Sequence, residues 1–139
     1  MKSIRLFGGV ASLFATLAFL VGCSDGPRKY DVSGTLTIDG AVPPAGSSIT
    51  FIPSDGKNTT EGCTLEAGKY STKVATGMYK VEIRAPKVIG KAKPVGKNDY
   101  QTQGEIVEEM LPAKYNDKTE LTFEVKAAKI EKNWELKTK

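Results

Sequence analysis

The placement of apolar residues at every second position is the feature that most limits how this chain can fold. The clearest stretch is 79–85, where Tyr, Val, Ile and Ala alternate with Lys, Glu and Arg. Side chains of a strand point alternately to its two faces, so this stretch predicts a strand with one apolar face. Comparable patterns predict about seven short strands in all, the others lying at 30–38, 49–53, 60–65, 70–74, 121–125 and 130–137.

Strands that each carry one apolar face must bury these faces against one another. The sequence therefore predicts an all-β fold, a single antiparallel two-sheet sandwich. The alternation also predicts which residues are mutually buried at the centre of the core. They are Tyr79, Val81, Ile83, Leu121, Phe123, Val125, Trp134 and Leu136.

The first 23 residues have the order of an export signal. Lys2 and Arg5 precede an apolar run over 6–21, which ends in Gly22-Cys23. A membrane span needs about 20 apolar residues, and this run supplies 16. A positive flank, a short apolar stretch and small residues at its end are typical of a cleaved signal peptide. We therefore assign residues 1–22 to the signal peptide.

The sequence Leu-Val-Gly-Cys over 20–23 resembles the bacterial lipoprotein cleavage box, in which the cysteine is acylated and becomes the first mature residue. This resemblance implies that Cys23 carries the lipid and attaches the protein to the membrane. Two acyl chains are sufficient for stable anchoring. The same resemblance implies an outer-membrane location, because Ser24 follows the cysteine where inner-membrane lipoproteins of this type usually have Asp. We expect a lipidated tether over 23–29, followed by one sandwich domain over 30–139.

Charge and histidine content exclude several functions. Removal of the signal lowers the formal net charge from +4 to +2, because Lys2 and Arg5 leave with it. This small charge, together with export, argues against a nucleic-acid partner. The chain contains no histidine, so neither a Ser-His-Asp nor a Cys-His catalytic arrangement can be built. Zinc held by His and Cys ligands fails for the same reason. We expect no enzymatic activity and no cofactor.

Cys63 is the second cysteine of the chain. With Cys23 committed to lipid, it has no intramolecular disulfide partner. A reactive thiol needs a positive or helix-N-terminal setting, whereas Cys63 lies two residues before Leu65 on the predicted inner face. We interpret it as a small buried hydrophobe.

The alternation lapses from Pro86 to Lys118, which predicts a connection longer than most in a compact domain. Long connections on a rigid scaffold often carry function, so this segment is the candidate interaction loop. Its lysines could attract an anionic lipid or polymer, and its tyrosines could stack on sugars. The candidate residues are Lys87, Lys91, Lys93, Lys97, Tyr100 and Tyr115.

Carboxylates offer a further possibility, a calcium site built from oxygen ligands. The candidate pairs are Asp55 with Asn58, and Asp99 with Glu105. Neither set has the spacing of an EF-hand loop, so the sequence predicts no metal site. The acidic cluster of Asp99, Glu105, Glu108 and Glu109 could instead supply two carboxylates for glycosidase-type catalysis, but such clusters are common on solvated loops, and a chain this small leaves little room for a substrate cleft.

Several short motifs, taken in order, resemble those of small bacterial lipoproteins with a carboxypeptidase-regulatory-like, transthyretin-related domain. The motifs are Val-Ser-Gly-Thr-Leu-Thr-Ile-Asp-Gly over 32–40, Ile-Thr-Phe-Ile-Pro over 49–53, Gly-Lys-Tyr over 68–70, Gly-Met-Tyr-Lys-Val over 77–81 and Leu-Pro-Ala-Lys-Tyr-Asn over 111–116. The resemblance implies a prealbumin-like or immunoglobulin-like sandwich without a catalytic role. It also implies that Leu111 and Tyr115 fold back onto the sandwich.

These observations favour two functional hypotheses over an enzymatic role. The first is a lipid-anchored structural or protein-interaction module of the cell envelope. The second is a module that binds carbohydrate or an anionic envelope polymer. Aromatic side chains exposed near the 86–118 connection would favour the second, and a buried Trp134 would weaken it.

The lipid assignment predicts the behaviour of a Cys23→Ala protein. Without the sulfur that accepts the lipid, this protein should accumulate as an uncleaved precursor or as a soluble secreted form. Labelling cells with a radioactive fatty acid and fractionating them measures both outcomes. If the Cys23→Ala protein were still cleaved at the parental bond and still appeared as acyl-labelled protein in the membrane fraction, Cys23 would not be the lipid site.

Overall fold

The computed structural model describes residues 26–91 and 104–139. This part of the chain contains ten strands and one short 3-10 helix, η1 (Ala113–Tyr115). The first five strands are β1 (Lys29–Ile38), β2 (Ser48–Pro53), β3 (Glu61–Thr64), β4 (Lys69–Ala75) and β5 (Gly77–Arg84). The others are β6 (Pro86–Lys91), β7 (Glu105–Glu109), β8 (Thr122–Val125), β9 (Ile130–Glu131) and β10 (Trp134–Leu136).

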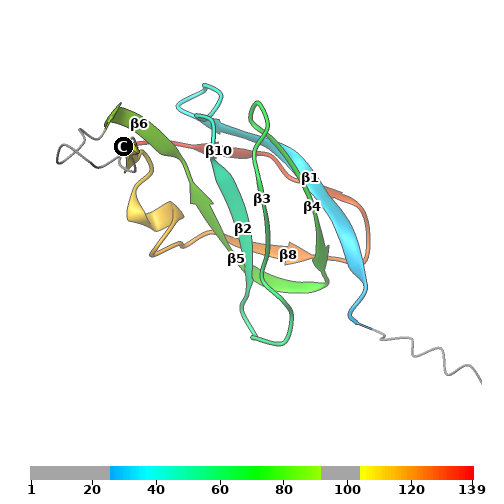
Figure 1. Cartoon of the computed structure of the whole chain (residues 1–139). Coiled ribbons are helices and arrows are strands. Elements are labelled where there is room, and N and C mark those ends of the chain that lie inside the picture. The colour runs from blue at the N-terminus through cyan, green and yellow to red at the C-terminus, as the bar shows by residue number, and fades with distance from the viewer. Residues whose placement is uncertain (1–25, 92–103) are drawn as a thin grey trace, which may run out of the picture.

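Two four-stranded sheets form the sandwich that the sequence predicts (Figure 1). One sheet has the order β10-β1-β4, with β9 also pairing with β1. The other has the order β3-β2-β5-β8, and all its pairings are antiparallel. Each of the seven predicted strand regions contains one strand, except 130–137, which contains β9 and β10.

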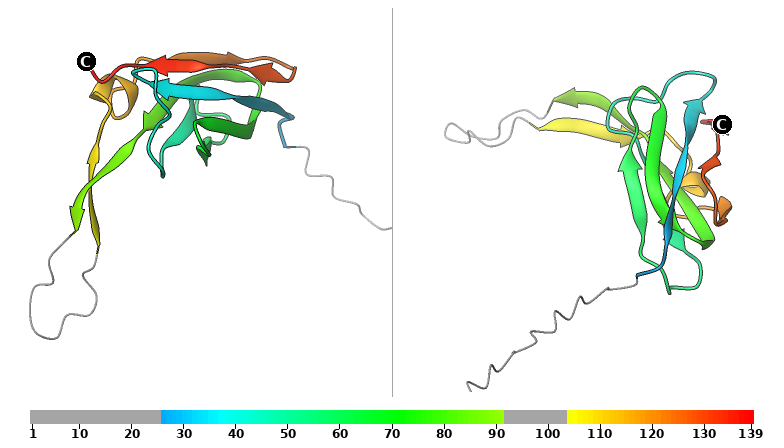
Figure 2. Two further views of the ribbon diagram at one scale, coloured as in Figure 1. Left: turned by 90° about the horizontal axis from the view of Figure 1, so that it is seen from above. Right: turned by 90° about the vertical axis from the view of Figure 1, so that its right-hand side faces the viewer.

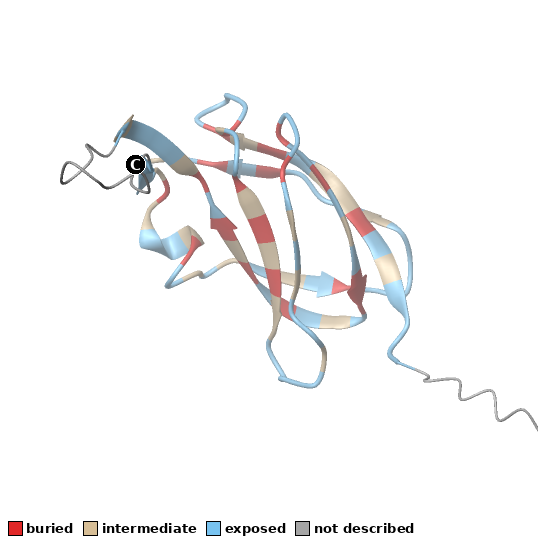
Figure 3. Ribbon diagram, in the orientation of Figure 1, coloured by how far each residue is buried: buried red, intermediate tan, exposed pale blue. Residues whose placement is uncertain are grey.

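The core lies between the inner faces of the two sheets, where the buried positions alternate along the strands (Figure 3). On β5, Tyr79, Val81 and Ile83 are fully buried, as predicted. They pack in one cluster with residues of β1 and β2, among them Leu36 and Phe51. Burying a side chain of this size stabilises the fold by about 1.5–3 kcal/mol.

Two of the predicted core residues, Leu121 and Phe123, are only half-buried. Phe123 lies on β8, which has a neighbour, β5, on one side only. An edge strand leaves part of its inner face open to solvent, which explains the exposure. The ring of Phe123 still contacts the aromatic cluster, with its centroid 6.1 Å from that of Phe51 and 6.2 Å from that of Trp134.

The pairing of β9 and β10 with β1 is parallel, which differs from the purely antiparallel sandwich that the sequence predicts. The ladder is interrupted opposite Gly34, where the backbone of Lys132 lies close against β1. A Cβ at Gly34 would lie 1.9 Å from the Lys132 carbonyl oxygen, so only glycine fits. The Asn133 side chain replaces the missing ladder bond, because its Oδ1 accepts the Thr35 backbone N–H at 2.9 Å.

The segment 86–118 contains regular structure, contrary to the sequence prediction. Strands β6 and β7 pair with each other as a separate two-stranded sheet, here called the β6–β7 ribbon. Figure 2 shows this ribbon extending away from the two stacked sheets. The alternation was hidden because β6 contains a bulge between Val88 and Gly90, which breaks the period of two.

Several predicted residues lie outside the described ranges. They are Cys23, Lys93, Lys97, Asp99 and Tyr100. Across 26–91 and 104–139, no helix is long and apolar enough to cross a membrane.

Candidate functional site

The base of the β6–β7 ribbon is fixed to the sandwich by backbone and carboxylate hydrogen bonds. Ala85, between β5 and β6, is fully buried. Its carbonyl accepts the Met110 N–H at 3.1 Å. The Glu109 Oε1 accepts the Ala85 N–H at 2.9 Å and the Leu111 N–H at 3.0 Å. The two strands therefore leave the sandwich from a bonded junction.

The segment after β7 folds back onto the sandwich, as the family resemblance implies. Leu111 is buried in the core, and Tyr115 packs against the core while half-buried. Asn116 is buried, and its Nδ2 donates to the Leu111 carbonyl at 3.2 Å. The Arg84 guanidinium joins this segment to β5 through Asp117. These contacts fix the segment that follows β7 to the sandwich.

Beyond its base, the ribbon carries aliphatic side chains that the rest of the described protein does not cover. Val88 is 50% exposed, Ile89 56%, Ile106 46% and Val107 56%. Only two other large hydrophobic side chains are exposed in the described ranges, Val42 and Met78. Two-thirds of this exposed apolar set therefore lies on eleven residues of β6 and β7.

These four residues lie within the predicted interaction segment but are not among the residues that the sequence predicted for it, which were lysines and tyrosines. A usable signal was present in the sequence. The pair Val-Ile at 88–89 lies between Lys87 and Gly90, and the pair Ile-Val at 106–107 lies between two glutamates. Such short matched runs on either side of a connection are typical of a two-stranded ribbon.

The structure changes the expected charge of the candidate interaction loop. Lys87 lies opposite Glu108 in the ribbon, and Lys91 lies opposite Glu105. Opposite charges at directly paired positions attract each other and stabilise the pairing. The two lysines that the structure describes thus face acidic partners, so this part of the segment is mixed in charge.

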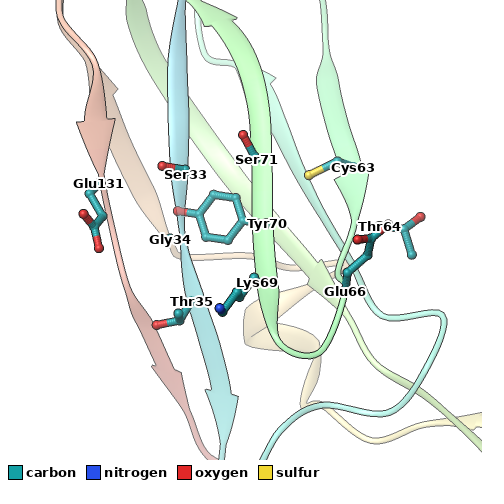
Figure 4. A pocket seen from close by; sticks show the side chains of 10 residues that line it. All are labelled: Ser33, Gly34, Thr35, Cys63, Thr64, Glu66, Lys69, Tyr70, Ser71 and Glu131. Carbon is teal, nitrogen blue, oxygen red and sulfur yellow. The ribbon is translucent and has the colours of Figure 1, made fainter.

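A groove of about 820 Å³ lies beside β4 (Figure 4). Its lining comes mainly from β1, β3 and β4, and most of the lining residues are of polar type, with Cys63 and Tyr70 among them. Cys63 is half-buried and packs against the core. Burial raises the pKa of its thiol, which lowers the thiolate fraction. This agrees with the interpretation of Cys63 as a small hydrophobe, although it is buried only in part.

Tyr70 forms the floor of this groove and is 3% exposed. Its hydroxyl donates to the Lys132 carbonyl at 2.6 Å and accepts from Trp134 Nε1 at 3.2 Å. Trp134 is itself buried. Neither ring offers an open face for sugar stacking, and the ring of Tyr115 lies under the Lys114 ammonium. These three aromatics therefore give no support to a carbohydrate platform.

The calcium candidates do not come together in the described residues. Asp55 Oδ1 accepts the Lys57 backbone N–H, and Asn58 Nδ2 donates to the Thr76 carbonyl. Asp55 thus stabilises the turn after β2, and Asn58 joins that turn to the connection between β4 and β5. In the described ranges, no group of three or more His, Cys, Asp or Glu side chains is placed to hold a metal ion.

Comparison with known proteins gives little further guidance. No protein-family model matches the chain, and no curated protein sequence matches it significantly. Among solved structures, the chain is similar to a crystal structure described as a "putative adhesin from Bacteroides ovatus", with 20% identity and a TM-score of 0.47. The match covers 85% of this chain and 49% of that chain, so this chain spans about half of that structure. So distant a likeness carries no functional argument, and the family resemblance stays a prediction.

The burial of Tyr70 generates a prediction about alkaline stability. Burial raises the pKa of Tyr70 from 10.0 to about 12, and burial also raises that of Tyr79. The unfolded chain releases the Tyr70 proton first, so its contribution is complete below pH 10 and is lost as the pH rises towards 12. The loss should reach roughly 2–3 kcal/mol.

Denaturant unfolding of the parent and of Tyr70→Phe, followed by Trp134 fluorescence, measures this effect. The variant should be less stable at neutral pH by about 1–3 kcal/mol, because it loses two buried hydrogen bonds. It should also lose less stability between pH 10 and 12. Parallel stability profiles for the two proteins over that range would contradict the assignment.

Proposed function

We propose that this chain is a lipid-anchored, non-enzymatic module of the cell envelope, which binds a protein partner through the β6–β7 ribbon. The observation that carries the proposal is the set of exposed aliphatic side chains on the ribbon, Val88, Ile89, Ile106 and Val107. The sandwich buries its own apolar faces, whereas the ribbon does not. Exposed apolar groups gathered on one element are typical of interaction sites.

The energetics indicate that the partner must supply polar contacts as well as apolar ones. Complete burial of an aliphatic side chain is favourable by about 1.5–3 kcal/mol, and each of the four is already about half covered. Covering all four would therefore contribute about 3–6 kcal/mol. Loss of translational and rotational freedom opposes binding by an estimated 4–15 kcal/mol. The apolar contacts thus need the support of further hydrogen bonds or charge pairs, which a protein surface can supply.

The position of the ribbon relative to the proposed anchor also supports this function. The ribbon and the start of β1 lie at opposite ends of the sandwich (Figures 1 and 2). The six residues from Cys23 to Lys29 can span at most roughly 20 Å, whereas the ten residues of β1 extend over about 33 Å. An anchor at Cys23 would therefore favour orientations in which the ribbon points away from the membrane.

The described residues favour a protein over an anionic polymer or a glycan. Lys87 and Lys91 lie opposite glutamates, which reduces the positive potential that an anionic polymer would require. Tyr70 and Trp134 are buried. The aliphatic residues of the ribbon have no chemistry suited to a charged polymer, but they match the apolar centre of a protein interface.

A double variant, Val88→Ser with Val107→Ser, tests the proposal in the full lipidated chain. Cross-linking in intact cells should recover roughly tenfold less partner with the variant than with the parent, because two apolar contacts are lost. The thermal unfolding midpoint should change little, since both side chains are half exposed. Met78→Ser, at a side chain 50% exposed on β5, is the matched control and should retain the parental yield. Equal yields from all three proteins would refute the proposal.

A further inference from the structure

We infer that the β6–β7 ribbon enters a two-walled apolar cleft in a different protein, which covers both of its faces. This inference rests on the proposed function and specifies the shape and chemistry of the partner. It excludes a second copy of this chain as the main occupant.

The register of the ribbon places apolar side chains on both faces. Val88 and Val107 are directly paired and therefore share one face, here called the valine face. Ile106 precedes Val107 and so points to the opposite face, the isoleucine face. A Cβ at Gly90 would lie 3.9 Å from the Ile106 Cδ1, which shows that the Ile106 side chain lies over Gly90. A partner that contacted one face only would leave the other apolar group in water.

The edges of the ribbon are unsuited to pairing with a second copy. In a two-fold pairing of β6 with β6 centred on Ile89, Lys87 of one copy would face Lys91 of the other. A two-fold pairing of β7 with β7 would place Glu105 opposite Glu108 or Glu109. Like charges at directly opposed positions destabilise strand pairing, and the bulge in β6 further disfavours an added strand.

Face-to-face contact between two copies is also insufficient. A two-fold packing of valine faces would bury one valine pair from each copy and leave both isoleucine faces exposed. Stable dimers bury about 1,200–2,000 Å² in total, far more than four valine side chains can supply. A cleft with two walls instead covers both faces at once, and it also supports a two-stranded ribbon that is only marginally stable alone in water.

The charges of the ribbon specify the rim of this cleft. Lys91 and Glu105 flank the valine face towards the outer end of the described strands, and Lys87 and Glu108 flank the isoleucine face towards the base. Both signs are present on each face. The partner should therefore have apolar walls and a rim that carries both acidic and basic groups, which is the usual arrangement of a protein interface.

Site-specific photocross-linking in living cells tests this inference. A photoreactive phenylalanine analogue replaces Val88 in one full-length protein and Ile106 in another, so that each reports on one face. The same analogue at Met78, which is equally exposed but lies on the sandwich, is the control. Cross-linked products are identified by mass spectrometry of the joined peptides.

We expect Val88 and Ile106 to cross-link to the same protein at two different segments of it, each with at least tenfold higher yield than Met78. Cross-links from only one face would overturn the two-walled cleft but leave the proposed function intact. Cross-links to a second copy of this chain would overturn the choice of partner. Absence of cross-links from both faces would refute this inference and the proposed function together.

Light scattering of the full lipidated chain in detergent provides an independent measurement. The inference predicts one copy per micelle, independent of protein concentration. A dimer that dissociates on introduction of Val88→Asp would show that the ribbon joins two copies, and would overturn the inference.

Discussion

The packing of β5 against the facing sheet is the interaction on which the rest of the structure depends. Tyr79, Val81 and Ile83 are fully buried, and β5 pairs with β2 on one side and with β8 on the other. The chain passes from β5 through the buried Ala85 directly into β6. The direction in which the ribbon leaves the sandwich is therefore set by the same burial that forms the core.

The position of β10, the last strand of the sandwich, depends on a few specific contacts. The backbone of Lys132 lies against β1 at Gly34, where no side chain larger than hydrogen fits. The Tyr70 hydroxyl donates to the Lys132 carbonyl, and Trp134 Nε1 donates to the Tyr70 hydroxyl. A buried polar group costs free energy unless it is paired. The arrangement thus pairs the carbonyl and the hydroxyl and keeps β10 beside β1.

Much of the fold could be predicted from the sequence, because the core strands have a clean period of two. The region 79–85 and the turns at Asp39-Gly40 and Ala67-Gly68 are the best examples, since both residues of each turn have positive φ. The parallel pairing of β9 and β10 could not be predicted, because alternation fixes the face of a strand and not the direction of its neighbour. The half-burial of Phe123 likewise depends on β8 being an edge strand.

The candidate site could be predicted only in outline. The lapse of alternation over about thirty residues marked 86–118 as a long connection, and the motif at 111–116 implied that this part folds back. The pairing of Lys87 and Lys91 with glutamates could not be predicted, because these partners lie across a connection and a bulge shifts their register. Taken without that pairing, the lysines indicate a basic surface, whereas the pairing leaves the aliphatic side chains of both strands as the exposed feature of the ribbon.

The central claim is that a stable sandwich carries a ribbon whose faces are completed by a partner. Amide hydrogen exchange of the full lipidated chain tests it most directly, measured in detergent and again in native envelope membranes. Amides of 77–84 should be strongly protected in both conditions, because they belong to the core strand β5. Those of 86–91 and 105–109 should exchange quickly in detergent and become at least tenfold slower in the envelope. Equal protection of the ribbon in both conditions would contradict the claim.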